Sequence, residues 1–374
     1  MPEDQDLGER DSEHNDDFPP SDRVIHTQGY DLSINTLQEQ WDDGTLVIPD
    51  FQREYVWDNP KASRLIESLL LNIPIPVLYF AETDQAQYEI VDGHQRVFSV
   101  VRYLNNQFAL SGLHISNEFK GKRFHQLPER EQRFLRTRSM RAIVIAADSS
   151  PTMKFEVFER LNTGGLALNA QEIRNAIYGG TFNNLLKELE THKVFRGALG
   201  LSRVRKRMVD RELVLRFLAM HDELATYRTP LVRFLNDYMR EHRSAGSAWI
   251  SRRRDLLIAT ASTAAAVYPN GAFRVTNLNG DPTEKSVNRA LYDAQMLVFA
   301  SISTPAAADA APEVRRQIGK LFLDDDFQNT IRRATGDKTR LRDRVLALIA
   351  ALEASGVEVR PSLAKSARKM AQAS

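Results

Sequence analysis

The chain of 374 residues contains no cysteine. This absence excludes disulfide scaffolds, zinc sites built on thiolates and catalysis by a cysteine nucleophile. The chain also lacks any apolar run close to the roughly 20 residues that a membrane-spanning helix needs. Its first residues have neither the basic start nor the apolar core of a signal peptide. We therefore expect a cytoplasmic protein without a membrane partner, and the length suggests two domains or one large one.

Net charge is nearly absent as well, because 50 Lys and Arg stand against 49 Asp and Glu, for a formal charge of +1. This sum hides opposing blocks. Residues 1–22 hold nine acids and one base, a charge of −8, so the remaining 352 residues carry +9. Residues 118–141 and 193–216 each hold eight Lys and Arg, against three and two acids. Such clusters are typical either of solvated helix faces or of a surface that binds a polyanion.

The sequence divides into four parts by composition and periodicity. Residues 1–22 bury too little apolar surface to offset the entropy of ordering, so we expect a disordered acidic tail. Residues 23–150 alternate short helix and strand signals, and residues 151–360 are helical in pattern. Residues 361–374 are polar and basic and predict a flexible tail. The predicted fold class is α+β, with an α+β front half and a mainly α-helical C-terminal half.

Individual elements can be expected from caps, turn residues and apolar spacing. Helices are expected after the cap residue Ser33 and from Pro60. Strands are expected over 46–48, 77–80, 88–91 and 141–146. In the second half, apolar spacing predicts helices over 229–242, 285–303, 313–322 and 338–354.

The first motif that could carry chemistry follows the strand expected at 46–48. It contains Gln52, Arg53, Tyr55 and Trp57. A guanidinium is suited to bidentate recognition of phosphate or carboxylate, and aromatic rings can stack on a base. The alternative is a loop that its aromatic residues anchor to the core, with one surface arginine.

The second motif is Asp92-Gly93-His94-Gln95-Arg96, between an expected strand and an expected helix. Gly93 permits a positive φ and close approach of a ligand, and the first N–H groups of the helix suit an anion. Arg96 adds a charged donor, and His94 and Gln95 add polar groups. Asp92 is unusual beside a phosphate unless it caps the helix or holds a metal ion or an arginine. The alternative is an ordinary helix that follows a hairpin.

The third motif surrounds a glycine turn between two expected helices. Its polar residues are Arg160, Asn162, Gln171, Glu172, Arg174 and Asn175. Each could be an ordinary surface residue. Their density around one tight turn favours the wall of a binding site.

The order of the three motifs resembles the N-terminal domain of GmrSD-type, modification-dependent (Type IV) restriction endonucleases, which is similar to the ParB/sulfiredoxin-like nucleotide-binding fold. The family motifs read F-Q-R-x-Y-x-W, D-G-Q-Q-R, and R-L-N-T-G-G followed by Q-E-x-R-N. They correspond here to residues 51–57, 92–96, 160–165 and 171–175. The resemblance implies a small mixed sheet, with the site completed by residues beyond 150. His94 departs from the family, which usually has glutamine there.

The resemblance implies a nucleotide-binding protein of a prokaryotic restriction or antiphage system that hydrolyses a nucleoside triphosphate with Mg²⁺. Catalytic candidates are Asp92, His94, Gln95, Arg96 and Glu172, with Asp92 as the tentative metal ligand. Nucleotide-binding candidates are Gln52, Arg53, Tyr55, Trp57, Gly93, Arg160, Asn162, Gln171, Arg174 and Asn175.

Two alternatives stay open. The protein could be a DNA-binding regulator that responds to nucleotide, with Arg203, Arg205, Lys206 and Arg207 contacting DNA. It could also be a nuclease that uses Asp92 and Glu172 around a metal ion. The helical half offers only His192, His221 and His242, in no recognisable HNH pattern, so we expect no HNH nuclease half and allow for a separate nuclease partner.

Overall fold

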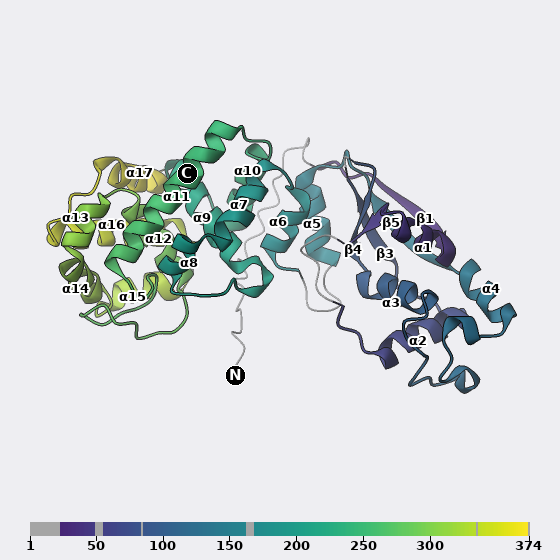
Figure 1. Cartoon of the computed structure of the whole chain (residues 1–374). Coiled ribbons are helices and arrows are strands. Elements are labelled where there is room, and N and C mark those ends of the chain that lie inside the picture. The colour runs from purple at the N-terminus through teal and green to yellow at the C-terminus, as the bar shows by residue number, and fades with distance from the viewer. Residues whose placement is uncertain (1–22, 49–54, 84, 162–167, 334–335, 373–374) are drawn as a thin grey trace. The chain divides into compact units, whose positions relative to one another are not determined.

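The computed structural model describes residues 23–48, 55–83, 85–161, 168–333 and 336–372. Its contacts divide the described chain into two compact units, which meet in sequence between Ile177 and Tyr178 (Figure 1). From the sequence, the boundary is expected near residue 150. The acidic segment 1–22, for which we predict disorder, lies outside the described residues.

The first unit is built on a five-stranded mixed sheet. Its strands are β1 (Thr27–Ser33), β2 (Leu46–Val47), β3 (Leu78–Glu82), β4 (Tyr88–Asp92) and β5 (Ser139–Ile145). They lie in the order β1-β5-β3-β4-β2. The β1–β5 and β3–β4 pairs are antiparallel, whereas β3–β5 and β2–β4 are parallel. This sheet and the helical second half confirm the predicted α+β fold class.

Six helices accompany the sheet. They are α1 (Ile34–Asp42), α2 (Asn59–Leu70), α3 (His94–Leu104), α4 (Glu129–Thr137), α5 (Pro151–Leu161) and α6 (Ala170–Ile177), with 3₁₀ turns η2 (Asn117–Phe119) and η3 (Phe124–Gln126). Ser33 caps α1, as predicted, by accepting a bond of 3.0 Å from Thr36 N. Asp58 caps α2 by accepting a bond of 2.8 Å from Lys61 N.

One hydrophobic core joins the sheet to α1–α4. Alternate residues of the strands point into it, including Leu78 and Phe80 of β3. Val97, Val100 and Val101 of α3 lie in the same core. This packing fixes α3 against the sheet, and therefore fixes the turn that joins β4 to α3.

A buried carboxylate holds one long loop of this unit. Glu67, on α2, accepts hydrogen bonds of 2.8 Å from the backbone nitrogens of Ile115 and Ser116, and longer bonds from His114 N. Burial raises the pKa of the Glu67 carboxyl, but the backbone donors outweigh burial and bring its pKa below the ordinary value. The ionised carboxylate thus ties α2 to residues 114–116.

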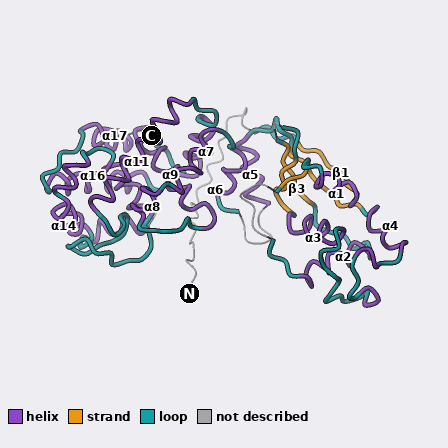
Figure 2. Tube along the Cα trace, viewed as in Figure 1, coloured by secondary structure: helices purple, strands orange, loops and turns teal. Residues whose placement is uncertain are grey.

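The second unit is helical throughout its named elements (Figure 2). They are α7 (Thr181–Thr191), α8 (Lys193–Leu199), η5 (Lys206–Met208), α9 (Val209–Glu223), η6 (Leu224–Thr226), α10 (Leu231–Glu241), α11 (Ser247–Val267), α12 (Arg289–Phe299), α13 (Thr304–Asp309), α14 (Ala311–Leu321), α15 (Asp325–Arg332), α16 (Lys338–Ala354) and α17 (Pro361–Gln372). Every residue of α12 from Ala290 to Phe299 is buried, so α12 is the central helix.

The C-terminal segment differs from its prediction. We expected a flexible basic tail over 361–374, but residues 361–372 form α17. Leu363, Ala367 and Met370 are buried along one stripe of this helix at spacings of four and three residues, and the stripe anchors the segment. The polar composition concealed this short apolar pattern. Across the described residues, no helix combines the length and the apolar character needed to cross a bilayer.

Candidate functional site

The second motif lies where β4 ends and α3 begins. Gly93 has φ +101° and forms the N-cap of α3. A Cβ atom there would lie 2.4 Å from Leu78 Cδ2, so both the backbone angle and the close packing require glycine. The β3–β4 register shifts between Tyr79 and Phe80, which inserts one extra residue into β4 just before Asp92. Bulges of this kind re-aim the side chains that follow them.

Arg96 fastens the turn to the neighbouring strand. Its Nη2 lies 2.7 Å from Asp92 Oδ2, and its Nη1 donates to the carbonyls of Pro76 and Val77. The Arg96 side chain is 11% exposed, against 42% for Asp92. Burial lowers the pKa of the Arg96 guanidinium, and the charge of Asp92 opposes this shift. Of the roles expected for Asp92, the structure thus has it holding an arginine, and Arg96 positions the turn.

Gln95 joins the second motif to the first. Its Oε1 accepts hydrogen bonds from the backbone nitrogens of Val56 and Trp57, at 3.0 and 3.2 Å. Because that oxygen is committed to two donors, the Gln95 amide nitrogen is the donor in the 2.8 Å contact with His94 Nε2. His94 Nε2 is therefore the acceptor in this contact.

Tyr55 of the first motif packs onto the same helix. Its hydroxyl lies 2.9 Å from Ser99 Oγ, and its ring centroid lies 5.0 Å from that of Phe98. The guanidinium of Arg102 lies over the Tyr55 ring, 4.6 Å from its centroid. Ser99 and Arg102 were not among the expected site residues. The sequence did hold a signal for them, because they follow Gln95 by four and seven residues on one helix face.

Trp57 is half-buried beside α2. The Lys61 ammonium lies 4.9 Å from the centroid of the Trp57 ring, a cation–π contact. The first motif thus uses two aromatic residues as anchors, in line with the alternative interpretation of this loop. Gln52 and Arg53, its candidate nucleotide ligands, lie outside the described residues.

The third motif forms the start of α6 and the end of α5. Glu172 Oε2 accepts from Asn169 N at 2.7 Å, and Asn169 Oδ1 accepts from Glu172 N at 2.9 Å, a reciprocal cap. Arg174 Nη1 donates to Gln171 Oε1 at 3.1 Å, and both residues are 1% exposed. These contacts give Glu172 a capping role and place Gln171 and Arg174 in the interior of the unit.

The remaining residues of this motif are more exposed. Arg160 forms a 3.3 Å ion pair with Glu156, one turn earlier on α5, and its side chain is 72% exposed. Asn175 is half-buried on α6. Asn162 lies outside the described residues.

The turn after β4 combines a helix N-terminus with one carboxylate. The first-turn N–H groups of α3 carry the positive end of the helix dipole. Asp92 is nearby and partly exposed, and only one of its oxygens faces Arg96. A single carboxylate suits Mg²⁺, which takes one or two protein carboxylates and completes its shell with phosphates and waters. In the described part of the chain, Asp92 belongs to no larger cluster of metal-ligating groups.

The basic segment 203–207 lies in the second unit and is only partly exposed. Arg205 donates to the buried carboxylate of Asp210 through its backbone nitrogen at 2.8 Å and through Nε at 2.7 Å. Arg203 and Lys206 are exposed, and Arg207 is half-buried with φ +63°. Of the four expected DNA ligands, Arg205 is thus engaged inside the protein.

Comparison with known families finds one match, and it covers most of the first unit. Residues 34–179 match the family described as GmrSD restriction endonuclease, N-terminal domain. All three motifs lie within the match, which runs from α1 to just beyond α6. Residues 34–179 are therefore similar to the N-terminal domain of GmrSD restriction endonucleases, the family that the motif order resembles. No curated protein and no solved structure matches the chain.

Proposed function

We propose that the protein is a nucleotide-binding, NTP-hydrolysing component of a restriction-type defence system, with its nucleotide site at the turn between β4 and α3. One observation carries this proposal. In a domain similar to the GmrSD type, Gln95 holds the loop of the first motif against the N-terminus of α3, where Asp92 and Gly93 lie.

The proposal assigns phosphate binding to the backbone N–H groups at the start of α3. Gly93 has no side chain, so it lets a phosphate approach the backbone closely. Arg53, which follows β2 and precedes the tethered loop, would supply the charged donor to phosphate. Tyr55 and Trp57 hold the loop, and Arg96 holds the turn. Gln95 and Arg96 are therefore positioning residues.

Hydrolysis would depend on Asp92. The bound metal ion would neutralise phosphate charge, and Asp92 would supply its protein ligand. The ion pair with Arg96 holds the Asp92 carboxylate at the turn. His94 lies at the same turn, where its Nε2 contacts the Gln95 amide nitrogen at 2.8 Å.

Melting temperature and turnover together test this function. Purified protein is melted with each of the four NTPs plus Mg²⁺, since a ligand that binds the native state stabilises it. NTP turnover is then compared between wild type, Asp92→Ala and Arg96→Ala. We expect one NTP to raise the melting temperature and both variants to lose turnover. A wild-type protein that neither binds nor hydrolyses any NTP would contradict the proposal.

The basic segment favours a second candidate function, a DNA-binding regulator without catalysis. Arg203 and Lys206 are exposed on one short segment that Asp210 anchors. DNA affinity that falls steeply with salt, and more gently in an Arg203→Gln/Lys206→Gln variant, would support it. The nuclease alternative has less support, because Glu172 caps α6. It predicts Mg²⁺-dependent nicking of plasmid DNA that requires Asp92.

A further inference from the structure

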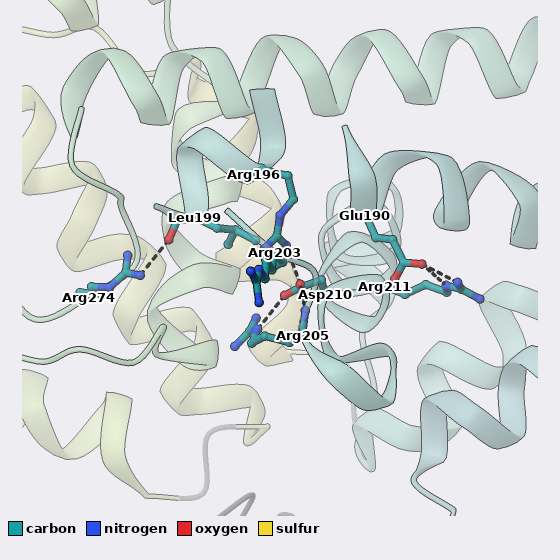
Figure 3. A network of polar contacts seen from close by, with 8 residues as sticks. All are labelled: Glu190, Arg196, Leu199, Arg203, Arg205, Asp210, Arg211 and Arg274. Atoms are coloured by element: carbon teal, nitrogen blue, oxygen red, sulfur yellow. Dashed lines mark hydrogen bonds and ion pairs between the residues drawn. The ribbon is translucent and has the colours of Figure 1, made fainter. Parts of the chain in front are cut away.

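The second unit contains a buried cluster of cationic side chains around one carboxylate (Figure 3). Asp210 is fully buried at the start of α9. Its Oδ2 lies 2.5 Å from Arg196 Nη1, and its Oδ1 lies 2.7 Å from Arg205 Nε. The Arg196 side chain is 9% exposed and the Arg205 side chain 26% exposed.

A third arginine adds charge without adding a carboxylate. Arg274 is 6% exposed, and within the described residues its guanidinium donates to the backbone carbonyls of Leu199, Ala272 and Lys285. Burial lowers the pKa of Arg274, and the positive charge of Arg205 lowers it further, so the two guanidinium groups lie within electrostatic reach of each other. Arg196 and Arg205 thus share the carboxylate of Asp210, and Arg274 adds a third positive charge near Arg205.

The neighbouring ion pairs do not correct this imbalance. Glu190 pairs with Arg211 at 2.5 Å, and Asp293 pairs with Arg216 at 2.5 Å. Each of those carboxylates already faces a buried arginine of its own. A buried charge without a counter-charge costs several kcal/mol, so an excess of cations in one place is a strong structural signal.

Within the described residues, buried hydrogen-bond donors without a partner occur among these arginines and on α12. Arg196 Nε and Arg205 Nη2 are buried and have no hydrogen-bond partner in the described part of the chain. The hydroxyl of Tyr292, on α12, is also buried and has no hydrogen-bond partner in the described part of the chain. Tyr292 is 0% exposed. Burial, and next the charge of Asp293, raise the pKa of the Tyr292 hydroxyl well above its ordinary value, so this hydroxyl keeps its proton. The charge of Asp210 also raises this pKa, and the charge of Arg205 lowers it. All three atoms can donate, and what they lack is an acceptor.

The backbone beside the cluster is held in an unusual conformation. Arg207 and Met208, which are consecutive and not glycine, have φ of +63° and +57°. Residues other than glycine keep a positive φ only where the contacts around them fix the backbone in that conformation. Here Arg196 Nη2 donates to the carbonyl of Arg203, and Asp210 binds the backbone of Arg205. The segment 203–207 therefore brings further cations, Arg203 and Lys206, to the surface next to the cluster.

We propose that the cluster of Arg196, Arg205 and Arg274 is a binding site for a phosphate-type oxyanion, separate from the site at the start of α3. The oxyanion balances the excess charge and accepts hydrogen bonds from the unpartnered donors. The oxyanion would enter from the side of Arg205, which is the most exposed of the three arginines. The phosphoryl group of a nucleotide and the backbone phosphate of a nucleic acid share this chemistry. The proposal does not depend on hydrolysis in the first unit.

Inorganic phosphate is the first probe. Thermal unfolding of the full chain is followed in sodium phosphate and in sodium chloride of equal ionic strength, and the phosphate dependence gives an affinity. Tyr292→Phe removes one neutral donor and should weaken phosphate binding about fivefold. Arg205→Lys keeps a cation beside Asp210 but removes the spare donor, and should weaken binding about tenfold or more.

The control variants separate this site from the nucleotide site and from misfolding. Asp92→Asn alters the site in the first unit and not the cluster, so combining it with Arg205→Lys should leave the roughly tenfold effect of Arg205→Lys on phosphate binding unchanged. In chloride, Tyr292→Phe should be at least as stable as wild type, since it removes a buried hydroxyl without a partner. Phosphate stabilisation that is absent, or that persists unchanged in both Tyr292→Phe and Arg205→Lys, overturns the proposal.

Two further probes identify the source of the phosphate. ATP and a short DNA duplex are tested against the same variants. Competition of inorganic phosphate by ATP alone assigns the site to a nucleotide. Competition by the duplex, with a salt dependence that weakens in Arg205→Lys, assigns it to a nucleic-acid backbone.

Discussion

Gln95 Oε1 lies 3.2 Å from the backbone nitrogen of Trp57, so the first turn of α3 holds the loop that carries the first motif. Val56 N donates to the same oxygen at 3.0 Å. The two motifs are almost 40 residues apart in sequence, as 95 minus 57 is 38. One amide side chain thus brings them to a single place, next to Asp92 and Gly93.

Replacing Gln95 tests this tether. Gln95→Leu removes the acceptor for two backbone donors, so we expect the nucleotide Kd to rise about tenfold and stability to fall by about 1–3 kcal/mol. Gln95→Glu is the matched control, because a carboxylate still accepts from Val56 N and Trp57 N. Isothermal titration with the preferred NTP gives both values of Kd. Equal Kd values for the two variants would count against a positioning role for Gln95.

Gly93 is expected to tolerate no side chain. Gly93→Ala combines a φ of +101° with a Cβ placed 2.4 Å from Leu78 Cδ2, so it should destabilise the protein by about 2–4 kcal/mol. Gly121→Ala is the control, since Gly121 has φ +81° but no atom within 4 Å of the added Cβ, and it should cost about 1 kcal/mol. Urea denaturation measures the difference, and an equal loss in the two variants would contradict the steric argument.

The stability of the first unit should depend on pH through Glu67. Its pKa in the folded protein lies below the ordinary value of 4.5, so its contribution is fully present above that value and is lost as the pH falls through the folded pKa. Glu67→Gln should be less stable than wild type at pH 7, and the difference should shrink at acid pH. Denaturant midpoints from pH 7 down to pH 3 provide the measurement. A difference that is constant with pH would show that Glu67 is not ionised in this contact.

Asp210 should matter for folding, whereas the exposed basic residues should not. Asp210→Asn leaves Arg196 and Arg205 without their carboxylate, and the loss should be about 3–5 kcal/mol. The variant Arg203→Gln/Lys206→Gln should change stability by less than about 0.5 kcal/mol, because both side chains are exposed. Thermal unfolding of the two variants distinguishes these roles. A stable Asp210→Asn protein would show that the cluster does not depend on this ion pair.

Much of the first unit could be predicted from local chemistry. Caps such as Ser33, the glycine at 93 and alternating apolar residues in β3 each specify a short element. β1 was not predicted, because most of its residues are exposed and it forms an edge of the sheet, so it lacks an apolar alternation. The sheet order also depends on long-range pairing, such as β3 with β5, that no local pattern reveals.

The candidate site could be predicted as a set of residues but not as a set of roles. Spacing placed Arg96 at the start of a helix, one turn from Asp92, but could not show that these residues pair with each other. Glu172 was expected to be catalytic, and its cap on Asn169 is visible only in three dimensions, although the spacing of three residues is that of a capping box. Arg205 was expected at the surface, and Asp210, five residues later, engages it.

The most direct test of the account is NTP turnover by the full chain with Mg²⁺, measured together with NTP binding, for wild type and Asp92→Asn. Asparagine keeps the size of the side chain and a hydrogen bond to Arg96, but removes the charge that would hold the metal ion. We predict that wild type hydrolyses one NTP and that Asp92→Asn still binds it, with turnover reduced at least 100-fold, about 2.7 kcal/mol in the barrier. Turnover that survives in Asp92→Asn, or a wild type without turnover, would contradict the account.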